Sequence, residues 1–286
     1  MIERLISKIN SLIEIDLGIK NKHPEIRGDK LTGCETYWEE QSRKIHDAYF
    51  GRTDRFFKVP VVQIHIASPD FSLGKHIVQK LKKTAVGIEF LGKISDSPLG
   101  GPIRIPQFPS ISPTTATHIA NLVYLEEVLN VDLSKSKRIV EFGGGYGGLS
   151  RCLKLINSTH QISIIDSQLM ADIQRDYLKN TLPSNEGFDI EFRRKIAEIN
   201  GGVDIFNASF SLSETPFETR AEVLNFIKNN CKNFLIIFQK EFLEYDNLSY
   251  FNNWIPSLSA THKCNIENYS WYCGRSDAYA FSGKII

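Results

Sequence analysis

The chain has 286 residues, enough to bury a substantial hydrophobic core in one large domain or two modest ones. Hydrophobic residues make up 42% of it and charged residues 23%, the balance of an ordinary soluble globular protein. The formal net charge of +1 gives no indication of nucleic acid or of an acidic membrane surface as a partner. No apolar run approaches the roughly 20 residues of a membrane-spanning helix, so we expect no membrane span.

The first predicted element is an amphipathic helix over residues 1–17, whose apolar residues recur at helical spacing between charged ones. The apolar set is Ile2, Leu5, Ile6, Ile9, Leu12 and Ile13. A signal peptide would need an uninterrupted apolar stretch, so this segment is not one. Its apolar face either closes against the core or pairs with a second copy, which leaves a homo-oligomer open.

Five cysteines are dispersed along the chain without a Cys-x-x-Cys pair, at positions 34, 152, 231, 264 and 273. Such an odd, scattered set favours reduced thiols and therefore a cytoplasmic protein. The set also lacks the spacing of a zinc site.

The signals up to residue 110 are mixed. After Tyr37 and Trp38, the apolar run over residues 59–67 predicts a strand, and residues 97–113 form a loop rich in glycine and proline. We expect residues 1–110 to form a mainly helical or mixed cap that selects the substrate, and residues 111–286 to form a second domain.

Ser112 and Pro113 mark a helix start, with Ser112 as the N-cap and Pro113 at the first helical position. The predicted helix runs to residue 129 and ends just before the next strand. We therefore expect it to pack on the sheet and to form a wall of the site.

From residue 137 onward, strand and helix signals alternate. The predicted strands span residues 138–142, 161–166, 188–193, 203–208 and 233–239. The predicted helices lie between them at residues 147–156, 169–181 and 216–230, and a last strand spans residues 279–285. This alternation predicts an α/β fold with a doubly wound, Rossmann-like sheet that helices cover on both faces.

The most informative motif is the glycine turn after the first of these strands. An acid, Glu141, stands two residues before Gly143, and a helical pattern follows the turn at once. Strand, tight turn and helix N-terminus in this order form a cradle for a nucleotide-type ligand, because glycines allow close approach and positive φ. A carboxylate at this place suits a ligand with a cationic end rather than a pyrophosphate. The predicted ligand contacts are Glu141, Gly143, Gly144, Gly145, Tyr146 and Gly147.

Two other interpretations of the turn stay open. The same residues spell Gly143-x-Gly145-x-x-Gly148, the dinucleotide fingerprint of dehydrogenases, and Asp166 lies 23 residues after Gly143. That is near the roughly 20-residue spacing of a ribose-binding carboxylate, which would suit any ligand with a ribose. Glu141 would repel a pyrophosphate. A turn without a ligand is the third option, although five glycines in six residues destabilise a chain that does not use them.

The exit of the predicted strand 203–208 is dense in hydrogen-bonding groups. They are Asn207, Ser209, Ser211, Ser213 and Glu214. Ligands of a doubly wound sheet bind at the carboxyl ends of its strands beside the switch point, and this strand would neighbour the first one. The alternative is a serine-rich loop in which Glu214 caps the next helix.

Glu214, His118 and His262 are the candidate catalytic bases at this edge of the sheet. Each histidine is also compatible with an ordinary surface position or a hydrogen-bonded structural role. His65 and His76 are weaker candidates.

Tyr269, Trp271 and Tyr272 follow His262 and either stack on a sugar ring or pack in the core. The chain shows no convincing metal-ligand cluster, since Asn207 and serines stand where some sugar methyltransferases carry Mg²⁺ ligands. We therefore expect no metal in the reaction.

The acid-x-Gly-x-Gly-x-Gly pattern of residues 141–147 resembles the first motif of class I S-adenosylmethionine-dependent methyltransferases. Residues 95–240 are more specifically similar to the sugar O-methyltransferases. The likeness lies in Ser97-Pro98-Leu99-Gly100-Gly101-Pro102, Ile111-Ser112-Pro113-Thr114-Thr115 through His118, residues 139–149, and Ser209-Phe210-Ser211-Leu212-Ser213-Glu214. After Asp166 the chain departs from the family's leucine and proline and has Ser167 and Gln168 instead.

The resemblance implies S-adenosylmethionine as the cofactor and a late strand that inserts antiparallel at the sheet edge. Glu141, the glycines, Asp166 and Ser209 would then contact the cofactor. Ser211, Glu214 and His118 would face the acceptor, a hydroxyl on a sugar of a surface polysaccharide or a glycosylated metabolite.

The sequence thus predicts a cytoplasmic enzyme that transfers a methyl group from S-adenosylmethionine to a hydroxyl of a sugar or glycan. Two alternatives remain, an NAD(P)-dependent oxidoreductase and a non-catalytic methyltransferase-like binding protein. The first of them predicts nicotinamide-cofactor binding that survives Glu141→Gln.

Overall fold

The computed structural model describes residues 32–68, 70–183, 189–243, 245–270 and 275–286. The predicted helix over residues 1–17, and with it the predicted pairing of two copies, lies outside the described residues. Trp271 and Tyr272 lie outside them as well.

A seven-stranded sheet forms the centre of the described part of the chain, with strand order β3-β2-β1-β4-β5-β9-β8. β1 to β5 run parallel, and β9 runs antiparallel to both β5 and β8. The strands are β1 (Arg138–Phe142), β2 (Gln161–Ile165), β3 (Ile190–Arg193), β4 (Val203–Ser209), β5 (Cys231–Gln239), β8 (His262–Asn268) and β9 (Ala278–Ile285). The predicted doubly wound α/β fold is confirmed, and its switch point lies between β1 and β4.

The last strand is not at the edge, where the resemblance put it. β9 lies inside the sheet between β5 and β8, and β8 forms the edge. The sequence analysis missed β8 because its pattern is largely polar and half-exposed, as is usual for an edge strand.

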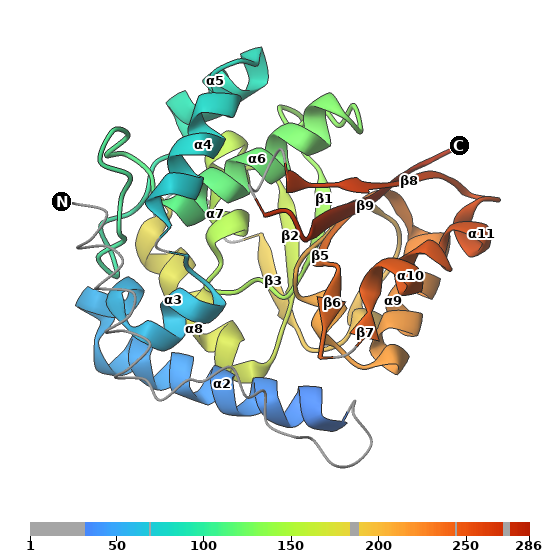
Figure 1. The fold of residues 1–286 in the computed structure, drawn as a ribbon, viewed down its shortest axis with the longest axis horizontal. Coiled ribbons are helices and arrows are strands. Elements are labelled where there is room, and N and C mark those ends of the chain that lie inside the picture. The colour runs from blue at the N-terminus through green and yellow to red at the C-terminus, as the bar shows by residue number, and fades with distance from the viewer. Residues whose placement is uncertain (1–31, 69, 184–188, 244, 271–274) are drawn as a thin grey trace.

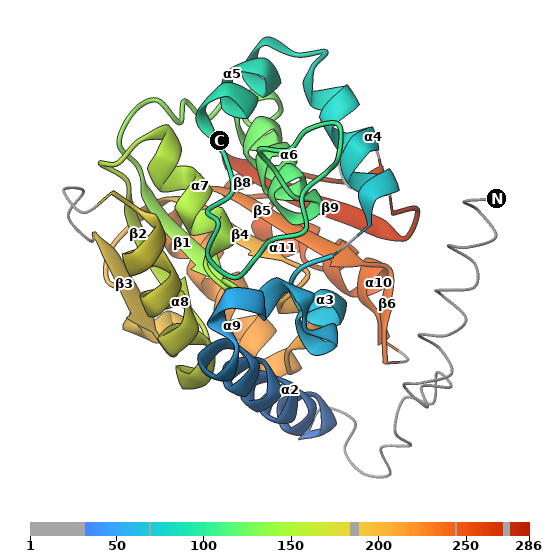
Figure 2. The ribbon, with the colours of Figure 1, turned by 90° about the vertical axis from the view of Figure 1, so that its left-hand side faces the viewer.

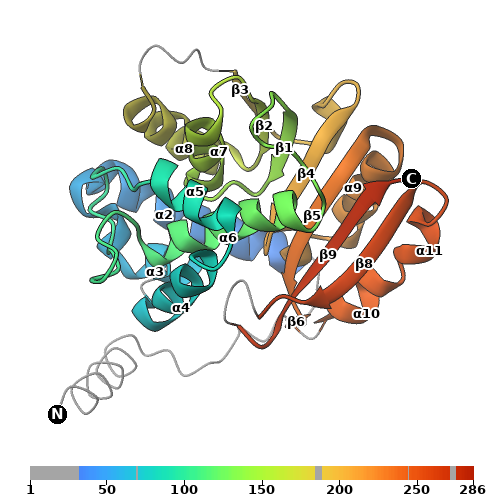
Figure 3. The same ribbon diagram turned by 90° about the horizontal axis from the view of Figure 1, so that it is seen from above.

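Helices cover both faces of the sheet (Figure 3). One face carries α6 (Pro113–Glu127), α7 (Gly148–Ile156) and α8 (Gln168–Thr181). The other carries α9 (Phe217–Asn230), α10 (Asn247–Asn252) and α11 (Ile255–Leu258). Short pieces join them: the 3-10 helices η2 (Ile196–Glu198) and η3 (Leu212–Glu214), and a hairpin of β6 (Glu241–Phe242) and β7 (Tyr245–Asp246).

Successive side chains of β1 enter different hydrophobic clusters, because strand residues alternate between the two faces. Ile139 packs in the cluster under α6 to α8, and Val140 packs in the cluster on the α9 side. Glu141 therefore points to the α6 to α8 face. The predicted N-cap of α6 is confirmed, since the Ser112 hydroxyl accepts a hydrogen bond from the backbone N–H of Thr115.

The described part of the cap consists of helices followed by an irregular segment over residues 94–112, which includes the predicted glycine- and proline-rich loop. Its elements are α2 (Thr32–Gly51), the 3-10 helix η1 (Thr53–Lys58), α3 (Pro60–His65), α4 (Phe71–Leu81) and α5 (Ala85–Lys93). In Figures 1 and 2, α2 and α3 lie at one end of the sheet, whereas α4 and α5 lie beside α6.

The strand predicted over residues 59–67 is wrong, because this run forms α3. Pro60 occupies the first turn of α3, where its missing N–H has no partner to lose and its fixed φ suits a helix. Val62 turns inward and is fully buried. An apolar run of this length is compatible with a buried helix as well as with a buried strand.

The cap packs against the rest of the chain through a continuous hydrophobic cluster that extends from Ile45 to Ala280. At one end of it, the Tyr49 hydroxyl of α2 donates a hydrogen bond of 2.8 Å to Asp176 on α8. The boundary between residues 110 and 111 stays a prediction. Among the residues that the structure describes, no helix is long and apolar enough to cross a membrane.

Gly283 of β9 offers a test of this packing. A Cβ at this position would lie 2.2 Å from Cε1 of Phe234, its fully buried neighbour on β5. We expect Gly283→Ala to lower the free energy of unfolding by about 1–3 kcal/mol in urea titrations, because the ring has no space to yield into. The control is Gly92→Ala in α5, where nothing lies within 4 Å of the added methyl. Equal unfolding free energies for the two variants would contradict the described packing of β5 and β9.

Candidate functional site

The turn between β1 and α7 depends on its glycines. Gly143, Gly145 and Gly147 have φ values of +72°, +54° and +93°, which side chains rarely adopt. A Cβ on Gly143 would also lie 2.2 Å from the Cβ of Ser211, in the loop after β4. The first glycine therefore permits two loops of the sheet edge to touch.

Ser211 has a structural part in this contact. Its hydroxyl donates a 2.5 Å hydrogen bond to the backbone carbonyl of Phe142, the residue just before the turn. The backbone N–H of Gly143 in turn donates to the carbonyl of Ile165 at the end of β2. The turn is thus held between β2 and the loop after β4, and the Ser211 hydroxyl is engaged there, whereas the resemblance implied that it faces the acceptor.

The Tyr146 side chain is buried between the cap and the domain. Its ring meets Phe57 of η1 edge-on at 4.8 Å and Tyr177 of α8 at 5.0 Å between centroids. A Cβ on Gly145 would lie 3.9 Å from Ile66, just after α3. The end of α3 therefore covers the turn. Because the Tyr146 ring is buried, the predicted ligand contact of this residue would come from its backbone.

Glu141 is a buried carboxylate, 4% exposed, at the end of β1. It accepts a hydrogen bond from the hydroxyl of Ser150 on α7. Burial raises its pKa to about 7, the charge of Asp166 adds to the rise, and the Ser150 hydrogen bond opposes it. None of the ion pairs among the described residues involves Glu141. A cationic group of a ligand beside Glu141 would therefore compensate the negative charge of its buried carboxylate.

Asp166 follows β2 on the other side of the turn. Burial raises its pKa to about 6, against hydrogen bonds from the backbone N–H groups of Ser167 and Gly144 and from Gln174. The Gln174 amide donates to Asp166 at 2.7 Å and to the carbonyl of Gly145 at 3.0 Å. Gln174 thus fixes the carboxylate and the turn relative to each other.

A chain of buried polar groups runs from Glu141 toward α6. Asn207 on β4 is the register neighbour of Glu141, and its amide nitrogen donates to Ser209 at 3.4 Å. Ser209 also accepts from Asn121 of α6 at 3.0 Å, and Asn121 accepts from the Tyr269 hydroxyl at 2.8 Å. The carbonyl oxygen of the Asn207 side chain is buried without a partner among the described residues. Tyr269 is fully buried, so it packs in the core and does not stack on a ligand.

His118 lies on α6 beside the glycine turn. A Cβ on Gly148 would be 2.7 Å from its Nε2, and its ring lies 6.2 Å from that of Tyr146. Both ring nitrogens are buried without a hydrogen-bond partner in the described part of the chain. Burial lowers the pKa of His118 to about 4, so the ring is neutral at pH 7 and a weak base.

His262 lies far from this edge. It begins β8 opposite Ile285, and its Nε2 lies 2.9 Å from the carbonyl oxygen of Cys231 at the start of β5. Its Nδ1 lies 2.9 Å from the hydroxyl of Thr261. The carboxyl ends of β1 to β5 are at the opposite end of the sheet, so the structure does not bring His262 to the site, and we assign it a structural role.

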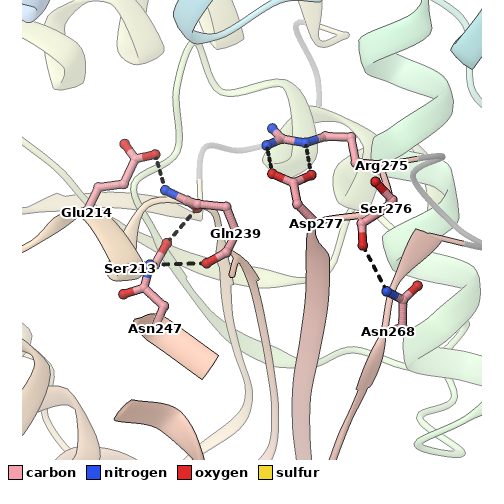
Figure 4. A network of polar contacts seen from close by, with 8 residues as sticks. All are labelled: Ser213, Glu214, Gln239, Asn247, Asn268, Arg275, Ser276 and Asp277. Atoms are coloured by element: carbon pink, nitrogen blue, oxygen red, sulfur yellow. Dashed lines mark hydrogen bonds and ion pairs between the residues drawn. The ribbon is translucent and has the colours of Figure 1, made fainter. Parts of the chain in front are cut away.

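Glu214, at the end of η3, is hydrogen bonded to Gln239 at the end of β5 (Figure 4). The Gln239 amide donates to its carboxylate at 2.8 Å. Burial raises the pKa of Glu214 to about 7, against hydrogen bonds from Gln239 and Trp38 and the charges of Arg275 and Arg220. A carboxylate with this pKa exchanges a proton readily near neutral pH.

Two rings of α2 lie near Glu214. The indole of Trp38 lowers the pKa of its carboxyl group, and burial and the charge of Glu214 raise the pKa of Tyr37. Trp38, Tyr37 and His65 contact one another edge-on, with centroids 5.5–5.9 Å apart. All three are half-buried. They form an aromatic wall beside the candidate base.

Sequence reasoning missed Gln174, Asn121 and Trp38. The first two are fully buried polar residues on otherwise apolar helix faces, a pattern that could have identified them. Trp38 gave no signal of this kind, because α2 itself was not predicted. Among the described residues, no cluster of His, Cys, Asp and Glu could hold a metal ion.

No protein-family model matches the chain, and no curated protein sequence matches it. The solved structures with a similar fold include magnesium protoporphyrin IX methyltransferase ChlM from Synechocystis PCC 6803 with bound SAM. It is 13% identical over 61% of this chain and 81% of its own, with a TM-score of 0.45.

Two further solved structures are similar to the same degree. The glycopeptide N-methyltransferase MtfA with S-adenosyl-L-homocysteine is 9% identical over 59% of this chain and 90% of its own, with a TM-score of 0.46. The mitomycin 7-O-methyltransferase MmcR is 14% identical over 87% of this chain and 68% of its own, with a TM-score of 0.44. These TM-scores are below 0.5. The assignment of the fold and of the candidate site is therefore based on the strand order and the contacts of this chain alone.

The raised pKa of Glu141 predicts a dependence of stability on pH. A folded-state pKa of about 7, above the ordinary 4.5, means that stability is lost as the pH rises through this window. Glu141→Gln keeps an acceptor for Ser150 and has no charge to bury. We expect it to be more stable than the parent protein by about 3 kcal/mol at pH 8 and by little at pH 5, in urea unfolding.

The matched control is Glu127→Gln, an exposed acid at the end of α6. It should change the unfolding free energy little at either pH. A Glu141→Gln variant with the same pH dependence as the parent protein would show that Glu141 keeps an ordinary pKa in the fold.

Proposed function

We propose that this protein is an S-adenosylmethionine-dependent O-methyltransferase that acts on a hydroxyl of a sugar or glycosylated molecule. The observation that carries the proposal is the buried carboxylate of Glu141, which forms no ion pair among the described residues and lies against the positive-φ glycine turn. A cofactor with a cationic end would fit this place, whereas a pyrophosphate would meet a negative charge.

The residues around the turn fit the rest of such a cofactor. Asp166, held by Gln174 at 2.7 Å, offers carboxylate oxygens for the two hydroxyls of a ribose. Asn207, the neighbour of Glu141, offers a buried carbonyl oxygen without a partner among the described residues, which suits an ammonium group. Ser209 stays a proposed contact, through the same chain of hydrogen bonds.

The chemistry needs an oriented hydroxyl and a proton acceptor. When bound, the sulfonium cofactor supplies an electrophilic methyl group and leaves as a neutral thioether. Glu214 would accept the proton as the acceptor oxygen forms its bond to the methyl carbon, and its pKa of about 7 suits this exchange near neutral pH. Of the two remaining candidates, His118 would line the cofactor end of the site, since it contacts the glycine turn.

The aromatic wall of Tyr37, Trp38 and His65 supports a sugar as the acceptor. Sugar rings present flat faces of C–H groups that pack on aromatic rings, and the adjacent Glu214 would then meet a ring hydroxyl. The wall comes from α2 and α3, which agrees with a cap that selects the substrate. The four described cysteines are free, which supports a cytoplasmic location.

The cofactor proposal predicts a pH-dependent affinity for S-adenosylhomocysteine. Its ammonium group requires Glu141 in the charged form, so affinity measured by calorimetry should rise about tenfold between pH 6 and pH 8. Glu141→Gln should bind more weakly at pH 8 and lose most of this rise. Asp166→Asn should weaken binding at both pH values, since it replaces one of the two acceptor oxygens for the ribose hydroxyls with a donor.

A nicotinamide dinucleotide is titrated in parallel. Binding of the dinucleotide alone, unaffected or improved by Glu141→Gln, would replace the methyltransferase proposal with the oxidoreductase alternative. Binding of neither ligand would favour the non-catalytic binding protein.

The base proposal predicts that Glu214→Gln separates binding from turnover. With radiolabelled S-adenosylmethionine and a panel of nucleotide sugars and glycans, the variant should lose about 100-fold or more in kcat and keep its affinity for S-adenosylhomocysteine. Glu218→Gln, an exposed acid in the first turn of α9, is the control and should leave both unchanged. Full turnover in Glu214→Gln would remove Glu214 from the proposed mechanism.

A further inference from the structure

Arg220 of α9 is the largest fully buried side chain of the described residues, with 0% exposure. Burying a guanidinium lowers the stability of the fold unless its donors are hydrogen bonded and its charge is compensated. None of the hydrogen-bond acceptors that the described residues give it is a carboxylate.

Two of its three hydrogen bonds hold the loop that carries Glu214. Nη2 donates to the carbonyl of Ser213 at 2.6 Å, and Nε donates to the carbonyl of Thr215 at 2.8 Å. These are the two residues that flank Glu214. The rings of Phe217 and Tyr250 each lie 5.1 Å from the guanidinium carbon and restrict it further.

A second path leads from Arg220 through Asn247 and Gln239 to the carboxylate itself, and Figure 4 shows its part from Asn247 to Glu214. Nη1 donates to the side chain of Asn247 at 2.9 Å, and Asn247 donates to the backbone carbonyl of Gln239 at 3.1 Å. The Gln239 amide donates to Glu214, and its oxygen accepts from the Ser213 hydroxyl at 3.0 Å. Arg220 thus supports both the backbone of Glu214 and the amide that hydrogen bonds to its carboxylate.

We propose that Arg220 is a positioning residue for Glu214: its hydrogen bonds fix the loop after β4, and its buried charge favours the carboxylate form of Glu214. The inference rests on the proposed role of Glu214 as the base. It assigns the electrostatic support of that base to α9, on the opposite face of the sheet from the glycine turn.

Glu214 has a second cation nearby. The charge of Arg275 lowers its pKa more than that of Arg220 does, but the guanidinium of Arg275 also pairs with Asp277 through two hydrogen bonds of 3.1 and 2.8 Å. Tyr37 and Cys34 are neutral, and the charge of Glu214 raises the pKa of both. The groups that face Arg220 itself are Tyr250, Cys34, Tyr245 and Glu214. Glu214 is the acid of this set.

Trp38 offers a readout that needs neither cofactor nor acceptor. Its indole lies close enough to Glu214 to lower the pKa of the carboxyl group, so its fluorescence should change as this group loses its proton. In a background with Trp254→Phe and Trp271→Phe, we expect one transition with a midpoint at about pH 7. Adding Glu214→Gln should abolish the transition and thereby assign it.

Arg220→Met in this background should move the midpoint up by about half a pH unit, because the carboxylate loses a buried cation while Arg275 stays in place. Arg220→Lys keeps a charge without the planar fork and should move the midpoint up by about half as much. The matched control is Arg151→Met, a second buried arginine, which donates to the carbonyls of Ser95 and Thr181 on the other face of the sheet. It should cost stability and leave the midpoint unchanged.

Folding of each variant is checked by circular dichroism. If Arg220→Met does not fold, the midpoint of Arg220→Lys is the test of the proposal. Midpoints equal to that of the parent in folded Arg220 variants would overturn the proposal and leave Arg220 a purely structural residue. This failure is distinguishable from failure of the proposed function, because the transition is observed without S-adenosylhomocysteine. A shifted midpoint in a protein that binds no S-adenosylhomocysteine would support the role of Arg220 and contradict the proposed methyltransferase function.

Discussion

The contact between Gly143 and Ser211 is the constraint on which the rest of the site depends. It requires a residue without a side chain at the end of β1 and a short, turned loop at the end of β4. Because the two loops touch, the carboxylates carried by β1, β2 and the loop after β4 gather at one edge of the sheet. The turn, Gln174 and the Ser211 hydroxyl then hold this arrangement without any ligand.

Burial raises the pKa of all three of these acids, Glu141, Asp166 and Glu214. A fold that concentrates acids in this way is less stable at neutral pH than the same fold with amides in their place. The two acids beside the turn have no compensating cation among their described contacts, whereas Glu214 has arginines near it. This difference separates the two halves of the site: the turn side suits a cationic ligand, and the Glu214 side suits proton exchange.

The sheet could be predicted from sequence because β1, β2, β4 and β5 are apolar runs that alternate with helices of ordinary length. The motif Glu141 to Gly147 and the serines after β4 could be placed at the same edge of the sheet for the same reason, since both follow buried strands. β8 was missed because an edge strand has half its surface in water and a polar pattern. His262 was wrongly ranked as a base because distance along the chain does not tell which end of a strand a residue occupies.

Other parts of the site have no local signal at all. Trp38 reaches Glu214 from a helix that lies about 170 residues earlier in the chain, and only the packing of the cap on the sheet brings them together. The same holds for Arg220, whose apolar surroundings would favour a leucine from periodicity alone. Buried polar residues of this kind depend on tertiary contacts, since Arg220 joins the loop after β4 to Asn247 of α10.

The insertion of β9 between β5 and β8 affects the order in which the strands of the sheet can pair during synthesis. Gln239, which hydrogen bonds to Glu214, is the register partner of Ala278, the first residue of β9. Until residues 278–285 have left the ribosome, β5 has an unpaired edge and β8 has no strand to join. The glycine turn is held by β2 and the loop after β4, which both precede residue 212. The strand that fixes the position of Gln239, and with it a hydrogen bond to the candidate base, is therefore translated well after every element that holds the glycine turn.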